Sequence, residues 1–527
     1  MHNPDPATDA SAKFPAALQD LNIDKFAVRI LIVFIAYAAL RSLVGAATRP
    51  FWYDEVCTII VTRQPSVSGI WSALAHAADS QGPGFCLIER MSAALLRNQE
   101  IALRLPSILA FCCITICLFV FIRRRAGSAY ALVCAAIPFT TKLFTRYAIE
   151  ARAYGLLVAC IAIALVAYQR APLLRWMCIM ALALAASLSF NYYAGLAMVP
   201  LGLAELYLLL IRRQIRWPVW IAFSLGVLPM AAFWPLLVAM RHNFSAHFWA
   251  KTSLTGQAFI YATLFLTSPP WGAALAAASV LAMAGLIIFF ARNSKGAAAP
   301  NSAPPHEYVL VLGLLALPFI GYAAAKLTHS GMTERYVLAA VLGISLAAGC
   351  ILPRLDRKSV LLAVTFLAAL LAAQEAEFWL AHAHQLSGID SPADSLATLV
   401  TSAGHPDLPV VISDGLEYLP IAHYAAPPWS ERFVTLVDPQ AALIFAGNDS
   451  LDTGLTVLRP FASLRVYDYK DFVLQHPTFL LYSENGSAPD PHDWWAERLF
   501  RDGYALKVLA VDHQRTIYLV TRPQESP

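Results

Sequence analysis

The stretch Arg49-Pro-Phe-Trp-Tyr-Asp-Glu-Val-Cys-Thr58 follows an apolar segment, residues 26–47, and carries two adjacent carboxylates, Asp54 and Glu55. Three aromatic residues precede the carboxylates, and tryptophan and tyrosine favour the headgroup level of a bilayer, where their rings are half hydrated. We therefore expect the acid pair to lie at the membrane surface, within reach of a lipid head group. Taken alone, the stretch is explained more simply by a solvated pair of loop acids, so the remainder of the chain has to decide.

The composition is that of a membrane protein. Of the 527 residues, 58% are hydrophobic and only 14% are charged, whereas soluble domains have about 25% charged residues. Residues 382–527 hold 9 Lys+Arg against 18 Asp+Glu, which leaves 29 against 16 for residues 1–381. We predict a polytopic α-helical membrane protein whose basic residues orient its helices, and we expect no nucleic-acid partner because no nucleic-acid-binding pattern occurs.

Apolar segments recur from residue 26 to residue 379, and about 20 such residues cross a bilayer as a helix. We expect about eleven spans, at 26–47, 101–122, 128–144, 152–168, 176–193, 195–211, 218–240, 271–291, 307–326, 336–352 and 359–379. Every second connection is short and basic, as in Arg123-Arg124-Arg125 and Arg212-Arg213. Basic loops stay in the cytoplasm, so the N-terminus is predicted inside and the C-terminal tail outside.

This alternation divides the chain into a cytoplasmic segment (1–25), a transmembrane domain (26–379) and an extracytoplasmic domain (380–527). In the first outer loop, 48–100, residues 67–76 and 85–96 have helical apolar spacing but are too short to span. We expect them to lie in the interface plane, and residues 257–267 are similar.

The tail has the composition of a soluble α/β domain. Its candidate strands are residues 409–413, 433–437, 478–482, 506–510 and 516–520, and its candidate helices are 416–424 and 493–502. Strands that alternate with helices predict an at least partly parallel sheet. Phosphate-binding glycine loops and CxxC spacings are both missing from the sequence, which disfavours ATP chemistry and a zinc site.

The outer loops bring acids to one face: Asp54, Glu55 and Asp79. A carboxylate there can deprotonate an acceptor hydroxyl or bind a divalent cation. On a helix, neighbouring residues such as Asp54 and Glu55 point about 100° apart. One of the two is then able to face a substrate while the other fixes the loop.

Cations are expected at the same surface, namely Arg152, Arg335, Arg146 and Lys142. A guanidinium matches phosphate because it donates two parallel hydrogen bonds. The alternative, which we favour for Arg146 and Lys142, is that the side chains reach up to lipid head groups.

The order of these motifs resembles a known family. Trp52-Tyr-Asp54-Glu55 follows the first span and Asp79-Ser-Gln-Gly-Pro83 comes later in the same loop. Arg146-Tyr-Ala-Ile-Glu150-Ala-Arg152-Ala-Tyr154 and Glu334-Arg335-Tyr336 follow. Residues 26–379 resemble the GT-C glycosyltransferases of the family 39 and dolichyl-phosphate-mannose–protein mannosyltransferase type, which include the bacterial lipid A aminoarabinose transferase. The chain departs from the family's usual Asp-x-His-Pro-Pro and Arg-Pro-Tyr at Gln81, Gly82 and Ala153.

The resemblance implies an inverting transferase that moves a sugar from a polyprenyl-phosphate carrier to an acceptor hydroxyl at the outer face. Asp54 matches the family's general base, Glu55 its partner and Asp79 the second acid of that loop. Arg152 and Arg335 match the cations near the lipid phosphate, with Arg146 and Lys142 as further candidates. Polar and aromatic residues of the same loops are expected to contact the substrates: Tyr53, Gln81, Glu150, Tyr154, His329 and Tyr336.

Two other functions stay open: a transporter or flippase, and an O-antigen-polymerase-like protein that handles lipid-linked saccharides. Against a transporter, the charged residues crowd the outer surface and the halves show no repeat. Expected partners are the lipid-linked donor, membrane lipids and a lipid, glycan or protein acceptor. No cofactor follows from the sequence, and a divalent cation, Mg²⁺ or Mn²⁺, is left open. We expect a bacterial inner membrane.

Overall fold

The first helix ends where the sequence forces it to. A computed structural model describes residues 13–244, 246–250, 252–265, 303–382, 391–484, 492–512 and 515–522. Its helix α1 (Lys13–Thr48) contains a 25-residue apolar part from Asp24 onward, which is long enough to cross a bilayer. The helix stops just before Arg49-Pro50, because proline disfavours the helical conformation in the residue that precedes it. The turn that follows places the stretch with Asp54.

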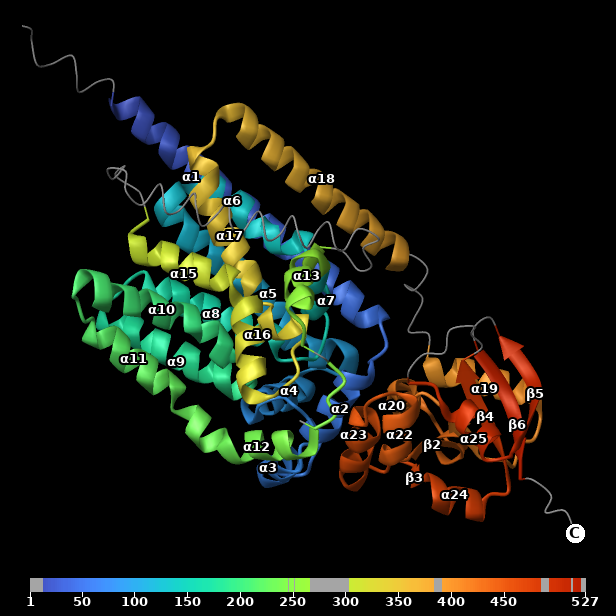
Figure 1. Ribbon diagram of the computed structural model, residues 1–527. Coiled ribbons are helices and arrows are strands. Elements are labelled where there is room, and N and C mark those ends of the chain that lie inside the picture. Colours follow the sequence, from blue (N-terminus) through green and yellow to red (C-terminus); the bar gives the residue numbers. More distant parts are fainter. Residues whose placement is uncertain are drawn as a thin grey trace, which may run out of the picture.

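Thirteen further helices of the described chain form a bundle together with α1 (Figure 1). They are α5 (Gln99–Ala126), α6 (Ser128–Ala136), α7 (Lys142–Ala148), α8 (Tyr154–Tyr168), α9 (Leu174–Phe190), α10 (Ala194–Arg212), α11 (Trp217–Val227), α12 (Pro229–Phe244), α13 (Leu254–Phe265), α15 (Pro305–Leu315), α16 (Leu317–Thr328), α17 (Ala340–Ile351) and α18 (Arg357–His382). Helix α8 lies at the centre, and its Tyr154 and Tyr168 are fully buried in one large apolar core.

The described residues contain fewer candidate spans than the sequence predicts for them. Five described helices are long and apolar enough to cross a membrane, or up to seven if two bent pairs count as one span each. The expected span 271–291 lies outside the described residues. The other ten expected spans all coincide with helices, but α8, α9 and α17 are shorter than a full crossing. Apolar composition therefore located the helices without giving their lengths.

Two expected spans are not straight. In the first, at 128–144, α6 and the 3₁₀ turn Ile137–Thr140 together meet α7 at 82°. In the second, at 307–326, α15 and α16 meet at 62°. Pro138 and Pro318 lie at these breaks, where proline removes a backbone donor and ends the preceding helix. The bend at α7 turns the chain toward the face that carries Asp54.

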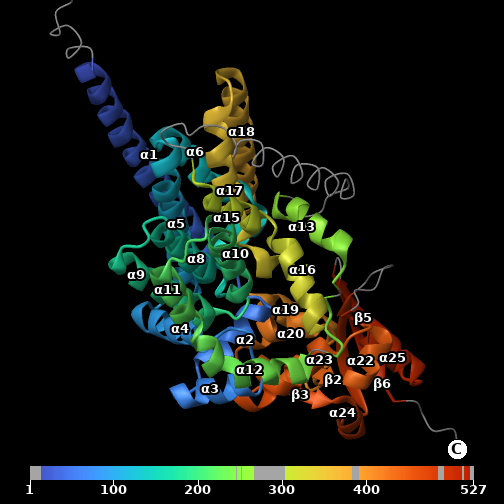
Figure 2. The same cartoon turned by 60° about the vertical axis from the view of Figure 1, so that its left-hand side comes forward.

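The basic connections gather at one end of the bundle. Arg123 pairs with Asp24 of α1, Arg125 with Glu307 of α15, and Arg216 with Glu205 of α10. Helix α2 (Tyr53–Thr62), which carries Asp54, and the soluble domain lie at the opposite end (Figure 2). The separation fits the predicted alternation of loops, while the side of the membrane that each end faces stays a prediction.

Three short helices fill the first outer loop: α2 (Tyr53–Thr62), α3 (Val67–Ala75) and α4 (Pro83–Leu95). The two helices predicted in this loop thus occur, at nearly the expected bounds, while their place in the interface plane stays a prediction. The Ser66 hydroxyl accepts from the Gly69 N–H and caps α3, and Pro83 occupies the first turn of α4, where a missing N–H costs nothing.

The C-terminal domain contains a six-stranded sheet with the order β3-β2-β1-β4-β6-β5. The strands are β1 (Val410–Ile412), β2 (Phe433–Val437), β3 (Val466–Asp468), β4 (Thr478–Glu484), β5 (Ala505–Asp512) and β6 (Arg515–Thr521). The first four are mutually parallel and the last two pair antiparallel, which confirms the predicted partly parallel sheet. Among the described strands, β3 alone was not predicted: it is as short as β1, but its sequence Val466-Tyr-Asp468 lacks the apolar run Val410-Val-Ile412 that marks β1.

In the described part of the domain, seven α-helices accompany the sheet: α19 (Pro392–Ala403), α20 (Gly415–Tyr424), α21 (Trp429–Arg432), α22 (Pro439–Phe445), α23 (Ser450–Leu458), α24 (Tyr469–Gln475) and α25 (Trp495–Arg501). Two of them, α20 and α23, lie beside the loop that carries α2 (Figure 2). Phe51, Ile59 and Leu74 of that loop share one buried cluster with Tyr418 and Leu455 of the soluble domain. The domain is therefore packed on the outer loop through a common apolar core.

Candidate active site

Asp54 is the second residue of α2, at the end of the helix that carries partial positive charge. Its side chain is 18% exposed, whereas that of the adjacent Glu55 is fully buried. The two neighbours therefore point into different surroundings, as the helical geometry predicts.

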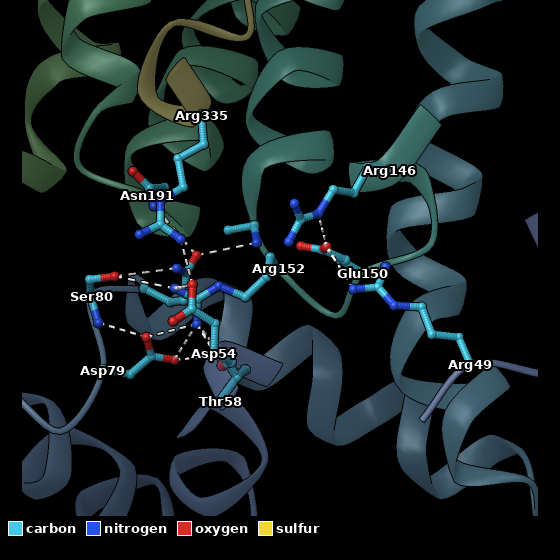
Figure 3. A network of polar contacts seen from close by, with 12 residues as sticks. Arg49, Asp54, Thr58, Asp79, Ser80, Arg146, Glu150, Arg152, Asn191 and Arg335 are labelled. Carbon is cyan, nitrogen blue, oxygen red and sulfur yellow. Dashed lines mark hydrogen bonds and ion pairs between the residues drawn. The ribbon is translucent and has the colours of Figure 1, made fainter. Parts of the chain in front are cut away.

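Two arginines from distant elements reach Asp54 (Figure 3). Arg335, in the 3₁₀ turn Glu334–Val337, donates to Oδ2 of Asp54. Arg152, just before α8, donates from Nη1 to the Asp54 carbonyl oxygen at 2.9 Å, and its Nη2 lies 3.9 Å from Oδ2. The Nε atoms of both arginines are buried and have no hydrogen-bond partner among the described residues. The site thus holds two guanidinium donors that still lack an acceptor.

Arg152 also joins Asp54 to the second acid of the loop. Its Nη1 lies 3.1 Å from Oδ1 of Asp79 and 2.8 Å from the hydroxyl oxygen of Thr58. Thr58 donates in turn to Oδ2 of Asp79 at 2.6 Å. Asp79 is only 7% exposed, so its carboxylate pairs with Arg152 and holds that side chain in place.

The turn after Asp79 requires a glycine at position 82. Gly82 donates its N–H to the carbonyl oxygen of Phe190 at 2.8 Å, and a β-carbon built on it would lie 2.2 Å from the carbonyl oxygen of Ser189. This close approach to the end of α9 lets the buried Gln81 accept from the Ala153 N–H at 3.2 Å. Gly82 therefore allows the turn to pack directly on the end of α9.

Glu55 forms a buried ion pair with Arg104 of α5. Arg104 donates from Nε to Oε1 at 2.8 Å and from Nη2 to Oε2 at 2.7 Å, and the Ala151 N–H also donates to Oε1 at 2.7 Å. Burial would raise the pKa of the Glu55 carboxyl, but the Arg104 guanidinium beside it brings that pKa below its ordinary value. Glu55 is a structural anchor in this geometry and has no exposed oxygen.

The remaining predicted cations have other partners. Arg146 donates to Glu150 at 2.8 Å and its guanidinium lies 5.3 Å from the ring centroid of Trp52. Glu150 is fully buried and also pairs with Arg49 at 3.3 Å. Lys142 pairs with Glu377 of α18 at 2.6 Å. These contacts tie α7 to α18 and, through Glu150, to the loop that precedes α2.

Aromatic rings border the arginines. Tyr193 and Tyr336 stack with centroids 3.6 Å apart, and Tyr154 lies 6.4 Å from Tyr336. The guanidinium of Arg335 lies 5.7 Å from the Tyr336 centroid and 5.9 Å from that of Trp249. Such rings can hold the guanidinium planes and offer apolar faces to the C–H groups of a sugar.

The structure thus brings together Asp54, Asp79, Gln81, Arg152, Tyr154, Arg335 and Tyr336. Tyr53 is partly buried against the soluble domain, and His329 is exposed at the C-terminal end of α16 with a positive φ of 53°. Thr58, Ser80, Asn191, Tyr193 and Trp249 were not foreseen. Thr58 had a signal, since it lies one helical turn after Asp54, whereas Asn191 and Tyr193 follow an apolar span with nothing to mark them.

The charges around Asp54 decide its protonation. Burial would raise the pKa of the Asp54 carboxyl, but Arg152 and Arg335 hold that pKa below its usual value. Asp54 is therefore ionised at neutral pH. Within the described residues, no group of three or more His, Cys, Asp or Glu side chains could hold a metal ion. Because Arg152 already contacts both Asp54 and Asp79, this donor set does not fit a divalent cation.

We expect Arg104→Met to destabilise the protein by about 3–5 kcal/mol, since it leaves the Glu55 carboxylate buried without its partner. Thermal unfolding of the purified protein in detergent measures this effect. Because the pKa of Glu55 is lowered in the folded state, the pair's contribution is present above the ordinary glutamate value, about 4.3, and is lost as pH falls. Combining Glu55→Gln with Arg104→Met should recover part of the stability, and an unchanged melting temperature for Arg104→Met would contradict the assignment.

Gly82→Ala should destabilise the protein by about 1–3 kcal/mol, because the added methyl group collides with backbone that cannot move freely. Gly195→Ala in α10 is the matched control, since its β-carbon would meet only the Met230 side chain, at 3.7 Å. Equal melting temperatures for the two variants would show that the turn tolerates a side chain.

Comparison with known proteins gives one answer, at the level of fold. Neither a protein-family model nor a curated protein matches the sequence. The crystal structure of ArnT from Cupriavidus metallidurans in the apo state aligns with a TM-score of 0.57 at 14% identity, over 94% of this chain and 100% of that one. ArnT bound to undecaprenyl phosphate aligns with a TM-score of 0.56 at 14% identity, over 94% and 99%.

An Archaeoglobus fulgidus oligosaccharyltransferase aligns more weakly, with a TM-score of 0.41 at 12% identity, over 85% of this chain and 67% of that one. ArnT is a GT-C lipid A aminoarabinose transferase. The resemblance predicted from the sequence is therefore confirmed as a likeness of fold: along nearly its whole length, the chain is folded like ArnT.

Proposed function

We propose that the protein is a membrane glycosyltransferase that moves a sugar from a polyprenyl-phosphate-linked donor to an acceptor hydroxyl, with inversion at the anomeric carbon. The observation that carries the proposal is the pairing of an ionised, partly exposed Asp54 with two arginines whose Nε–H groups have no acceptor in the part of the chain that the structure describes. Such a site holds a base beside a place for an anion.

The anion is the phosphate of the lipid carrier. Arginine binds phosphate through parallel hydrogen bonds, and Arg335 and Arg152 each have a buried Nε–H to offer. A donor attached to a lipid must be met where the bundle meets the membrane surface, and Asp54 lies at one end of the bundle. The solved structure of ArnT with undecaprenyl phosphate, which has the same fold, supports a ligand of this class.

The reaction assigns one role to each group. The acceptor O–H gives its proton to the Asp54 carboxylate while its oxygen attacks the anomeric carbon. The bond from that carbon to the phosphate oxygen breaks on the opposite face, and the electron pair leaves with the lipid phosphate. Arg335 and Arg152 stabilise the negative charge that develops on the leaving group. Attack opposite the leaving group inverts the anomeric configuration.

The two arginines also tune the base. With the site empty they lower the pKa of Asp54, which makes the carboxylate a weak base. A bound phosphate engages the same guanidinium groups and adds negative charge nearby, and both effects raise the pKa of Asp54. The carboxylate thus becomes a stronger base when the donor is in place.

Other residues of the site act as positioning or binding groups. Asp79 and Thr58 hold Arg152, while Glu55 holds the helix that carries Asp54. The rings of Tyr154, Tyr193 and Tyr336 lie beside the arginines. They are placed to pack against the sugar or the first isoprene unit of the carrier.

Asp54→Asn tests the central assignment. The amide keeps the shape of the side chain but cannot take a proton, so the release of polyprenyl phosphate from a polyprenyl-phosphate hexose should fall by about 10²–10⁴-fold. The assay uses purified protein in liposomes with a mixture of candidate acceptors. Asp471→Asn, on an exposed position of α24, is the control. Equal release by wild type and Asp54→Asn would remove Asp54 as the base.

Arg335→Gln should lower the turnover and move the acidic limb of the pH profile of kcat/KM to higher pH. The sign follows because Arg335 lowers the pKa of Asp54, and its removal lets that pKa rise. Arg335→Lys keeps the charge but loses the forked geometry, so it should restore the position of the limb more than the rate. An acidic limb that does not move in Arg335→Gln would contradict the pairing of Arg335 with Asp54 as a determinant of activity.

A further inference from the structure

The soluble domain bonds directly to the turn that precedes Asp54. The Phe51 N–H donates to the hydroxyl of Tyr424, the last residue of α20, at 3.0 Å. The same hydroxyl donates to Oε1 of Glu100 at 3.1 Å. The Phe51 ring also meets His423 edge-on at 5.5 Å. One end of α20 therefore holds the backbone three residues before the proposed base.

A second contact reaches the residue next to Asp54. The hydroxyl oxygen of Tyr53 would lie 3.1 Å from a β-carbon built on Gly454, in the middle of α23. Glycine weakens a helix interior by about 1 kcal/mol relative to alanine. The absence of a side chain at position 454 leaves room for the Tyr53 phenol.

A third contact reaches the other side of the site, where Arg335 lies. The Ser450 hydroxyl, at the start of α23, accepts from the Trp249 N–H at 3.2 Å and donates to the His247 carbonyl oxygen at 3.3 Å. The preceding Asp449 pairs with His247 at 3.4 Å. The Trp249 ring in turn borders the Arg335 guanidinium. Helix α23 thus contacts both the helix that carries Asp54 and the segment beside Arg335.

We propose that the C-terminal domain is a positioning part of the catalytic centre: Tyr424 and Gly454 set the place of Asp54, and Ser450 sets the segment that borders Arg335. The inference rests on the proposed function, in which Asp54 is the base and Arg335 binds the phosphate. Within the bundle, the turn before α2 is held by Arg104 of α5, which donates to the carbonyl oxygens of Ala46, Arg49 and Pro50. The same turn is also held by the soluble domain. A shift of about 1 Å at a reacting group can cost 10²-fold in rate, so the contacts from the soluble domain control turnover.

Tyr424→Phe and Tyr418→Phe form a matched pair in one helix. Each removes a hydroxyl that accepts a backbone N–H, from Phe51 in the first case and from Arg465, at 2.7 Å, in the second. Arg465 belongs to the soluble domain itself. Tyr424→Phe should lower kcat by about tenfold or more with the donor KM within about twofold of wild type. Tyr418→Phe should lower the melting temperature without a comparable loss of kcat. Equal effects of the two variants on kcat would overturn the proposal.

Gly454→Ala tests the Tyr53 contact with a change that favours the helix it is made in. The added methyl group should displace Tyr53 and lower kcat, while the melting temperature stays at or above that of wild type. Tyr53→Phe removes the crowded hydroxyl, so the double variant should recover activity relative to Gly454→Ala. Ser402→Ala, at an exposed position of α19, is the control. A double variant no more active than Gly454→Ala would overturn this contact as the cause.

Hydrogen exchange separates this inference from the proposed function. Backbone amides of residues 51–58 should exchange faster in Tyr424→Phe than in Tyr418→Phe or wild type, in protein reconstituted without substrate. If wild type releases no polyprenyl phosphate while exchange increases as expected, the proposed reaction fails and the positioning contact stands. If exchange in residues 51–58 is the same in all three proteins, the positioning contact fails whatever the activity.

Discussion

The structure of the site depends on the buried pair of Glu55 and Arg104. Arginine has five N–H donors, and all five are used here: two bonds go to Glu55 and three to the carbonyl oxygens of Ala46, Arg49 and Pro50. Both side chains are fully buried. Two charges removed from water are tolerated only when geometry and hydrogen bonding are complete. That requirement locks the turn between α1 and α2 to α5, and it thereby fixes the direction in which α2 presents Asp54.

Adjacent acids therefore have opposite tasks. Glu55 faces inward and forms an ion pair with Arg104. Asp54 faces the two arginines whose Nε–H groups have no partner in the described chain. If both acids were buried in ion pairs, the site would have no general base. If both were exposed, α2 would lose the ion pair that holds it to α5. The rotation of about 100° between neighbouring helical residues separates the two roles without any further device.

The soluble domain packs against the proposed reaction centre and is not a separate unit beside it. The domain has an apolar cluster of its own, yet helices α20 and α23 share a second cluster with the outer loop and contact the chain on both sides of the proposed reaction centre. The parallel order of β3, β2, β1 and β4 brings α20 and α23 to the same region of the domain. Figure 2 shows these helices against α2 and α12. The sequence predicted most of the strands of this domain but none of its contacts with the site.

The sequence by itself determined where the helices and most of the strands lie, which loops carry charge, and that Asp54, Asp79, Arg152 and Arg335 belong to one end of the bundle. These features follow from local apolar runs and from loop order, both of which a single chain displays. It did not give the number of full crossings, because bends at Pro138 and Pro318 and short central helices depend on packing. It could not tell that Glu55 is an anchor, that Lys142 pairs with Glu377, or that Tyr424 reaches Phe51, since those partners are 49, 235 and 373 residues apart. Long-range pairs have no local pattern, so only the tertiary structure decided them.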